Sequence, residues 1–348
     1  MSHYFKAAVL TKINAPLEII ELRLPKLESG QVLVQNRFSG ICRSQLMEVT
    51  GQRGKDNWLP HLLGHESYGT VREIGPDVSK VSIGQKVVLS WIKGFGINSI
   101  NPKFISKEGK LINSGPSTTF SEYSVVSENR VFDSPTDYPE ELLPQFGCAW
   151  LTGAGMVLSN FNLQNIADKL AVLVIGFGGV GTGAALVLKS FPNVEITILE
   201  KSQQRQELAK KLGFSRVYSD LIQYREFNEG EQFDYCIESS GSVLCIQEGF
   251  QSLRDQGTIV FASHPKNGEL ISIDPYDLIK GKTIKGTWGG GLPPDSALIK
   301  VKDRLKGANI DFNNLIGPKF TLESINEGLT HLESAGANKP IIDFGDLN

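Results

Sequence analysis

Short apolar runs separated by glycines characterise the first part of the chain. The segments QVLVQNRFS (31–39), SYGTVREIG (67–75) and QKVVLSWI (85–92) have the length and flanking residues typical of β-strands. Residues 91–119, by contrast, are polar and without a regular pattern. The pattern predicts a β-rich first part with a long loop or lobe at 91–119.

From Leu170 onward the pattern changes to strands that alternate with helices. LAVLVI (170–175) is a continuous apolar run, as in buried parallel strands. An amphipathic helix is expected after Ser202 as its N-cap and before Gly213 as its stop. Further strands are predicted at 194–200, 233–239 and 257–263. This alternation indicates a parallel α/β domain.

The connecting and final segments complete the predicted elements. Residues 139–161 are expected to form a helix with a Gly/Thr break after Cys148. From about Gly291 the chain returns to short helices, and it ends in KPIIDF (339–344), a predicted strand. We expect this last strand to pack back on the first part.

Composition and charge narrow the class of protein. The 348 residues suffice for two domains, and a net charge of -3 gives no sign of a nucleic-acid or anionic-membrane partner. No apolar run approaches the roughly 18–20 residues of a membrane span, and the N-terminus lacks a signal-peptide pattern. We therefore expect a cytoplasmic protein whose few cysteines are reduced. They are Cys42, Cys148, Cys236 and Cys245, of which the last two are expected to be core thiols.

A glycine motif opens the α/β part. In VIGFGGVG the residues Gly176, Gly178 and Gly181 have the G-x-G-x-x-G spacing, directly after a predicted strand and at the start of a helix. This context favours dinucleotide binding at the helix N-terminus. Glu200 ends the next predicted strand, where a carboxylate accepts hydrogen bonds from the adenosine ribose and repels the 2′-phosphate of NADP. NAD is therefore favoured, although an ordinary solvated glutamate is the structural alternative.

Three dispersed residues could bind a metal ion. Cys42 in GICRS, His65 in LLGHESYG and Cys148 in FGCAWLTG together make a three-ligand zinc set with an open fourth position, as catalytic zinc requires. Taken singly, each is more often a core thiol or a buried structural histidine. Their spacing alone does not distinguish these alternatives.

Four motifs taken in order carry a family resemblance. GICRS, LLGHESYGTVREIG, FGCAWLTGAG and VIGFGGVG resemble the zinc-dependent medium-chain alcohol dehydrogenases, and the similarity runs over nearly the whole chain. The resemblance implies a GroES-like, β-rich catalytic domain at 1–149 and 291–348. It also implies a doubly wound Rossmann domain for NAD at 150–290.

The resemblance also implies roles for individual residues. Cys42, His65 and Cys148 would hold one catalytic Zn²⁺, with Glu66 behind the ion and Ser44 beginning a proton relay from the substrate. Arg43 and Lys339 would contact the cofactor pyrophosphate, Thr152 the nicotinamide, and Arg205 the ribose beside Glu200. The glycine motif would contribute the remaining cofactor contacts through Gly176, Gly178, Gly179, Val180 and Gly181.

The substrate is left open between a simple alcohol and a sugar-derived polyol. Trp58 and Trp91 are candidate pocket residues, and Trp150 follows Cys148 closely, although each tryptophan could equally be a core aromatic. By resemblance we expect a homodimer or homotetramer built through the dinucleotide-binding domain. His61 and His264 are expected to be packing or surface residues.

This chain departs from the family pattern in three places. Residues 91–119 contain no cysteine, so we expect one zinc per chain and no structural zinc. Gln45 stands where an aspartate often supports the ligand histidine, and Met47 stands where some members end the relay with a histidine. Two alternatives therefore stay open: a zinc-free quinone or enoyl reductase of the same fold, and a non-catalytic NAD(H)-binding protein.

Overall fold

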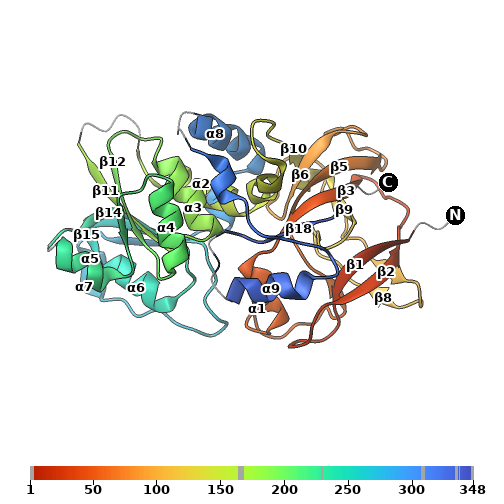
Figure 1. The fold of residues 1–348 in the computed structure, drawn as a ribbon, viewed down its shortest axis with the longest axis horizontal. Helices are drawn as coiled ribbons and strands as arrows, with labels where there is room; N and C mark the ends of the chain where they lie inside the picture. The colour runs from red at the N-terminus through yellow and green to blue at the C-terminus, as the bar shows by residue number, and fades with distance from the viewer. Residues whose placement is uncertain are drawn as a thin grey trace.

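The computed structural model describes residues 4–163, 168–228, 230–306, 310–333, 336 and 338–345. Figure 1 shows two halves side by side: the N-terminal strands with the last strand of the chain, and the α/β part. Three β-sheets make up this architecture. Within the described residues, no helix is both long and apolar enough to cross a membrane.

The first sheet is small and antiparallel. Its strand order is β4-β1-β2-β7-β8, and a cluster of buried side chains that includes Phe5, Leu22 and Phe104 packs against it. β7 and β8 come from the predicted lobe at 91–119, which is therefore only partly irregular. The strands are β1 (Tyr4–Leu10), β2 (Glu18–Arg23), β4 (His61–Leu62), β7 (Phe104–Ser106) and β8 (Leu111–Ile112).

The second sheet confirms the strand predictions for the first part and for the chain's end. Its order is β10-β6-β5-β3-β18-β17, with β9 also paired to β3. The last strand, β18, pairs antiparallel with β3, with Ile341 opposite Gly40. The strands are β3 (Gln31–Gly40), β5 (Glu66–Ile74), β6 (Lys86–Ser90), β9 (Tyr123–Ser127), β10 (Val131–Asp133), β17 (Lys319–Phe320) and β18 (Ile341–Asp343).

The third sheet is parallel, as the alternating pattern predicts. Its order β13-β12-β11-β14-β15-β16 reverses direction next to β11, and ligands bind at such a reversal. The strands are β11 (Leu170–Ile175), β12 (Val194–Leu199), β13 (Arg216–Tyr218), β14 (Phe233–Glu238), β15 (Leu253–Phe261) and β16 (Thr283–Gly286). Its helices are α3 (Gly179–Leu188), α4 (Gln203–Lys211), α5 (Leu221–Phe227), α6 (Val243–Gln251) and α7 (Pro275–Ile279). Ser202 stands at the N-cap of α4, and Gly213 follows its end with φ 85°, as expected.

The helix predicted at 139–161 is interrupted earlier than expected. Residues Glu140–Gly147 form a 3-10 helix, and the break lies at Cys148 itself, with φ -148° and ψ -73°. Pro144 accounts for part of the difference because it lacks the N–H that an α-helical turn requires. The α-helix α2 (Ala149–Asn160) begins only after the break, so Cys148 sits at a junction between two helices.

Among the remaining helices, α8 (Pro294–Lys306) links the segment after Gly291 to the α/β part. It packs on α2 and α3, so the segment after Gly291 begins against the α/β part before its last strand returns to the second sheet. The other elements are α1 (Arg43–Val49), α9 (Ile325–Glu333) and the 3-10 helices η1 (Glu128–Arg130), η3 (Gly289–Gly291) and η4 (Phe312–Leu315).

A buried carboxylate anchors the lobe that lacks cysteines. Glu128 accepts hydrogen bonds from the backbone N–H groups of Ile97, Ser79 and Lys80, at 2.8, 3.0 and 3.2 Å. Burial works to raise the pKa of Glu128, but these donors outweigh it and hold the pKa below its usual value. The ionised carboxylate thus joins Ile97 of the lobe to the neighbouring turn at Ser79 and Lys80, in a lobe that has no cysteines for a metal to bind.

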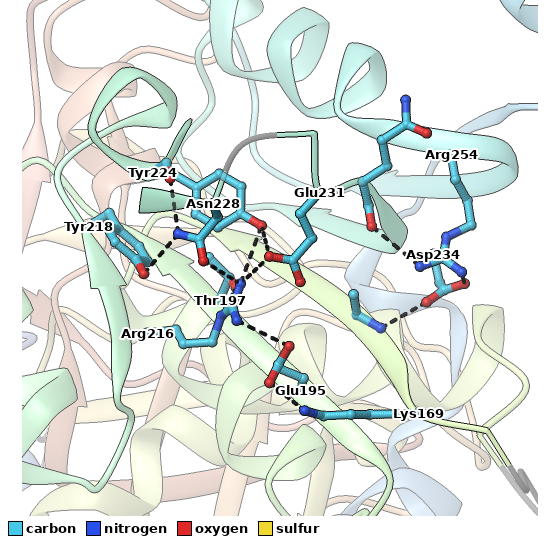
Figure 2. A network of polar contacts seen from close by, with 12 residues as sticks. Lys169, Glu195, Thr197, Arg216, Tyr218, Tyr224, Asn228, Glu231, Asp234 and Arg254 are labelled. Atoms are coloured by element: carbon cyan, nitrogen blue, oxygen red, sulfur yellow. Dashed lines mark hydrogen bonds and ion pairs between the residues drawn. The ribbon is translucent and has the colours of Figure 1, made fainter. Parts of the chain in front are cut away.

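Charged side chains fasten the outer strands of the third sheet, as Figure 2 shows. Arg216 on β13 donates to Glu231 at 2.5 Å and to Thr197 on β12 at 3.0 Å, and its other nitrogen lies 3.2 Å from Glu195. Lys169 contacts the other oxygen of Glu195 at 2.5 Å. This network ties β12 and β13 to the turn after α5, away from the cavity described below.

Candidate active site

A cavity of about 1000 Å³ is lined by residues from both halves of the molecule. The carboxyl ends of β11 and β12 and the N-terminus of α3 form one wall, and α1 contributes to another. Among the residues with predicted roles, Glu66 and Gly181 are not part of the lining. Those that line it are Cys42, Arg43, Ser44, Trp58, His65, Trp91, Cys148, Thr152, Gly176, Gly178, Gly179, Val180, Glu200, Arg205 and Lys339.

The three predicted metal ligands meet in this cavity. Cys42 immediately precedes α1, His65 immediately precedes β5, and Cys148 lies at the junction before α2. Their potential ligand atoms all lie within 4.8 Å of one another, and His65 Nε2 is 3.2 Å from Cys148 Sγ. Segments distant in sequence thus place one imidazole and two thiols around a common point.

The negatively charged groups around these ligands would be balanced by a bound cation. A hydrogen bond from Cys148 lowers the pKa of Cys42 well below its usual value, and the Lys339 ammonium contributes to this. Burial works to lower the pKa of Lys339, but the Glu66 carboxylate and the two cysteine sulfurs outweigh it and raise this pKa above its usual value. Lys339 and Glu66 form a buried ion pair. The hydrogen bond to Cys42 and burial raise the pKa of Cys148 well above its usual value, so this sulfur keeps its proton until a metal ion displaces it. With both sulfurs ionised on a metal, they and the Glu66 carboxylate exceed the one ammonium by two negative charges, which a dication would balance. Glu66 Oε2 is also buried without a hydrogen-bond partner among the described residues.

Gln45 supports His65 in place of a carboxylate. Its side-chain amide nitrogen lies 2.7 Å from His65 Nδ1. In this orientation the ring N–H is at Nε2 and faces Cys148, whereas a metal ligand needs a free lone pair at Nε2. Turning the amide by half a rotation presents Oε1, which accepts an Nδ1–H and frees Nε2. The donor set therefore fits a zinc ion, with a neutral amide behind its histidine.

The start of the predicted relay is present, and its usual end is not. Ser44 lines the cavity and donates a 3.4 Å hydrogen bond to Gln45 Oε1. Met47 also lines the cavity but is almost completely buried, and its thioether cannot transfer a proton.

The glycine motif forms the expected strand–turn–helix. Gly176 has φ 87°, and Gly178 is the N-cap of α3. A Cβ at Gly181 would lie 1.9 Å from Gly176 O, so only glycine allows the helix to approach the turn this closely. The first turn of α3 presents its free N–H groups to the cavity.

Glu200 contacts the backbone beside the glycine turn. Its two oxygens accept hydrogen bonds from Phe177 N at 2.7 Å and Ser202 N at 2.8 Å. Arg205 Nη1 lies 3.9 Å from Glu200, and its Nε donates to Gly336 O at 3.0 Å. Each carboxylate oxygen keeps a second lone pair, so Glu200 can still accept from a ribose hydroxyl in the cavity.

The structure also gives the contacts of two further residues that were predicted to bind the cofactor, Thr152 and Lys339. Thr152 on α2 lines the cavity, and its Oγ1 is buried without a hydrogen-bond partner among the described residues. This oxygen is therefore available for a hydrogen bond to a bound cofactor. The Lys339 ammonium is paired with Glu66, and its chain passes beside Gly179. A pyrophosphate contact by Lys339 therefore stays a prediction, while its link to the metal ligands is a finding.

Two of the three tryptophans considered in the sequence analysis line the cavity, and the third lies in the hydrophobic core. Trp91 Nε1 donates to Cys148 Sγ at 3.2 Å, and its ring meets Trp288 edge to face at 5.0 Å. Trp58 is 71 % exposed at the cavity. Trp150 is buried against Phe146, so it is a core residue, and it is not part of the lining of this cavity.

Sequence reasoning missed some of the lining. Trp288, which lines the cavity, has no role in the sequence analysis, although its place beside a run of glycines is a signal that could have identified it. Cys236 is buried as expected, whereas Cys245 is half-buried on α6 and lines the cavity. His264 is exposed beside Trp288, and His61 is buried at another part of the cavity wall.

Comparisons with known proteins agree with this geometry. Residues 28–136 match the alcohol dehydrogenase GroES-like domain, and residues 179–303 match the zinc-binding dehydrogenase domain. Class-3 alcohol dehydrogenase from Cereibacter sphaeroides is 24% identical over 97% of this chain and 99% of its own length. S-(hydroxymethyl)glutathione dehydrogenase from Paracoccus denitrificans is 23% identical over the same shares.

Solved structures give the same result. Benzyl alcohol dehydrogenase from Acinetobacter calcoaceticus superposes with a TM-score of 0.85 and 26% identity, covering 99% of this chain and 100% of that one. An alcohol dehydrogenase zinc-binding domain protein from Burkholderia ambifaria has the same TM-score and coverage at 25% identity. Because both halves match and the relatives extend from end to end, this chain belongs to the zinc-dependent medium-chain alcohol dehydrogenases and is an NAD-dependent alcohol oxidoreductase.

Proposed function

We propose that the chain binds one catalytic Zn²⁺ through Cys42, His65 and Cys148 and oxidises an alcohol with NAD. The observation that carries the proposal is the meeting of these three ligands in the same cavity as the glycine turn. When bound, zinc would act as a Lewis acid on the substrate oxygen, and NAD would accept or deliver the hydride.

The chain's own residues position the reactants. Ser44 would take the proton of the substrate hydroxyl, and Thr152 would hold the nicotinamide that accepts the hydride. Trp91 forms the apolar wall next to Cys148. Because the Met47 thioether cannot carry a proton, Ser44 would pass the proton to the cofactor ribose and solvent, or to another group.

The cofactor contacts extend along the turn and the end of β12. The free N–H groups at the start of α3 and the exposed Arg43 guanidinium face the pyrophosphate, as Lys339 is also proposed to do. Glu200 and Arg205 face the adenosine ribose. The Glu200 carboxylate favours NAD over NADP because it would repel a 2′-phosphate.

The substrate is an alcohol or a sugar-derived polyol. Relatives bear the names benzyl alcohol dehydrogenase and S-(hydroxymethyl)glutathione dehydrogenase, which indicate different alcohols. Trp58 and Trp91 would contact the apolar part of either substrate. The proposed division is 1–149 with 291–348 for the catalytic domain and 150–290 for the cofactor domain. A cytoplasmic location completes this proposal.

A homo-oligomer, dimer or tetramer, would form through the third sheet. β16 is an outer strand of that sheet and is mostly exposed. An exposed edge strand pairs readily with a second copy of itself. Apolar side chains exposed in the segment before it would be covered by that copy: Leu270, Ile271, Tyr276, Leu278 and Ile279.

Metal content and turnover test the proposal together. Protein purified without chelator should hold one tightly bound zinc per chain and reduce NAD with an alcohol, and Cys148→Ser should lose both. If the wild type takes up no zinc when zinc is supplied and is still active, the assignment moves to a quinone or enoyl reductase. A wild type that bound NAD(H) without any turnover would indicate a binding protein.

A further inference from the structure

A second group of potential metal ligands lies outside the thiolate set. Glu48 is near the end of α1, Asp56 is in the loop that follows, and His61 begins β4. Their ligand atoms lie within 4.8 Å of one another. His61 Nε2 is 2.8 Å from Asp56 Oδ2 and 3.9 Å from Glu48 Oε1. Glu48 and His61 line the cavity that also contains Ser44.

Each of these three side chains is held in place by its other polar atom. His61 Nδ1 lies 2.9 Å from Leu62 O, and Asp56 Oδ1 accepts a 2.8 Å hydrogen bond from Trp58 N. Glu48 Oε2 accepts from Arg53 Nη1 at 3.3 Å. The atoms that remain are Nε2, Oδ2 and Oε1, and these are the ones that converge. Metal ligands are oriented in this way by partners outside the coordination sphere.

The contacts of His61 require a cation between the converging atoms. A carbonyl oxygen only accepts, so the contact with Leu62 places the single proton of a neutral imidazole on Nδ1. In that neutral form Nε2 would face the Asp56 carboxylate lone pair to lone pair, a repulsion that either a proton or a metal ion on Nε2 removes. The side chains of His61 and Asp56 are only 8% and 11% exposed, so water screens this repulsion little. Arg53 does not relieve it, because its contact is with the other oxygen of Glu48.

We propose that Glu48, Asp56 and His61 bind a second divalent transition-metal ion. One imidazole nitrogen and two carboxylate oxygens suit Mn²⁺ or Zn²⁺, whereas the softer thiolate set selects zinc. Three protein ligands would leave coordination positions open, and Glu48 and His61 line the cavity. An ion held there would offer those positions to oxygen atoms of a bound hydroxylated molecule. This metal site takes no part in hydride transfer, so it can be tested separately from the proposed function.

The test uses Mn²⁺ as the probe on enzyme already carrying zinc at the thiolates. Equilibrium dialysis against Mn²⁺, followed by elemental analysis and electron paramagnetic resonance of the free ion, counts the extra equivalent. We expect one Mn²⁺ per chain in the wild type and at least ten-fold weaker binding in His61→Gln and in Glu48→Gln. Cys148→Ser should lose zinc and keep the Mn²⁺ site. His264→Gln is the matched control, because this histidine lines the same cavity and is not one of the three proposed ligands.

Two results would overturn the proposal. If wild-type enzyme binds neither Mn²⁺ nor Zn²⁺ beyond the thiolate site, the cation between Nε2 and Oδ2 is a proton. If the wild type and both variants bind Mn²⁺ equally, the ion lies elsewhere. Should His61→Gln fail to fold by circular dichroism, Glu48→Gln decides, because Glu48 is 26% exposed and tolerates the change more easily.

Discussion

At the scale of single residues, the support behind His65 is the most informative departure from the family pattern. The Gln45 side chain contacts His65 Nδ1 at 2.7 Å and can present either a donor or an acceptor there. An aspartate would present only acceptors, and its charge would strengthen the imidazole as a ligand. The amide thus supports the ligand geometry with less electrostatic stabilisation of the ion.

Gln45→Asp should therefore tighten zinc binding by about ten-fold, as partners of ligand histidines commonly do. Competition with a chromophoric chelator measures the change, and Gln45→Ala should shift affinity in the opposite direction. Equal zinc affinity in all three proteins would mean that Gln45 does not support His65.

Glu200 is the second residue whose charge has a defined consequence. Glu200→Gln keeps an oxygen for the Phe177 N–H but removes the negative charge near the ribose. We expect the ratio of kcat/KM for NADP to that for NAD to rise by about ten-fold, because the repulsion of a 2′-phosphate is lost. An unchanged ratio, with the fold intact by circular dichroism, would remove Glu200 from the specificity determinants.

At the scale of elements, the lobe at 91–119 depends on Glu128. The pKa of this carboxylate is held below its usual value, so its stabilising effect is present above the unfolded pKa of about 4.3. The effect is lost as the pH falls through the lower folded pKa.

Glu128→Gln should lower the free energy of unfolding at pH 7 by about 1–3 kcal/mol, because backbone donors lose a charged acceptor. The difference between the two proteins should shrink as the pH is lowered below about 4. Urea unfolding at several pH values measures it, with the exposed Glu73→Gln as control. A difference independent of pH would show that the loss comes from packing and not from ionisation.

At the scale of the whole molecule, the exposed edge of the third sheet is where we propose that copies of the chain pair. Ile279 is 79% exposed on α7, which directly precedes the edge strand β16. Isolated exposed apolar residues are common, but a cluster of them beside an unpaired strand marks an interface.

Ile279→Lys should shift the protein toward monomers in sedimentation velocity, because a buried charge would oppose pairing of the two edges. Ile222→Lys is a suitable control, since Ile222 is 74% exposed on α5 of the same half. The interface lies elsewhere if Ile279→Lys sediments like the wild type, or if the control dissociates equally.

The sequence alone determined the order of elements and the chemistry that each carries. Apolar runs and their glycine boundaries encode strands locally, so β3, β5, β6 and β11 fell where the pattern placed them. The glycine turn before α3 was predictable because its spacing reflects a backbone requirement that only glycine meets. Cys42, His65 and Cys148 could be assigned as ligands only because the motifs around them resemble those of a known family. Three residues far apart in the sequence have no local pattern of their own.

Only the tertiary structure decided which of these residues meet. The Glu66–Lys339 pair, the cavity around the thiolates and the convergence of Glu48, Asp56 and His61 join segments that hydrophobic periodicity does not relate. Trp150 and Trp91 likewise have similar surroundings in sequence, yet one is packed in the core and the other faces Cys148. The physical reason is that strand and helix formation depend on neighbouring residues, whereas burial, charge pairing and metal coordination depend on distances that exist only once the chain has folded.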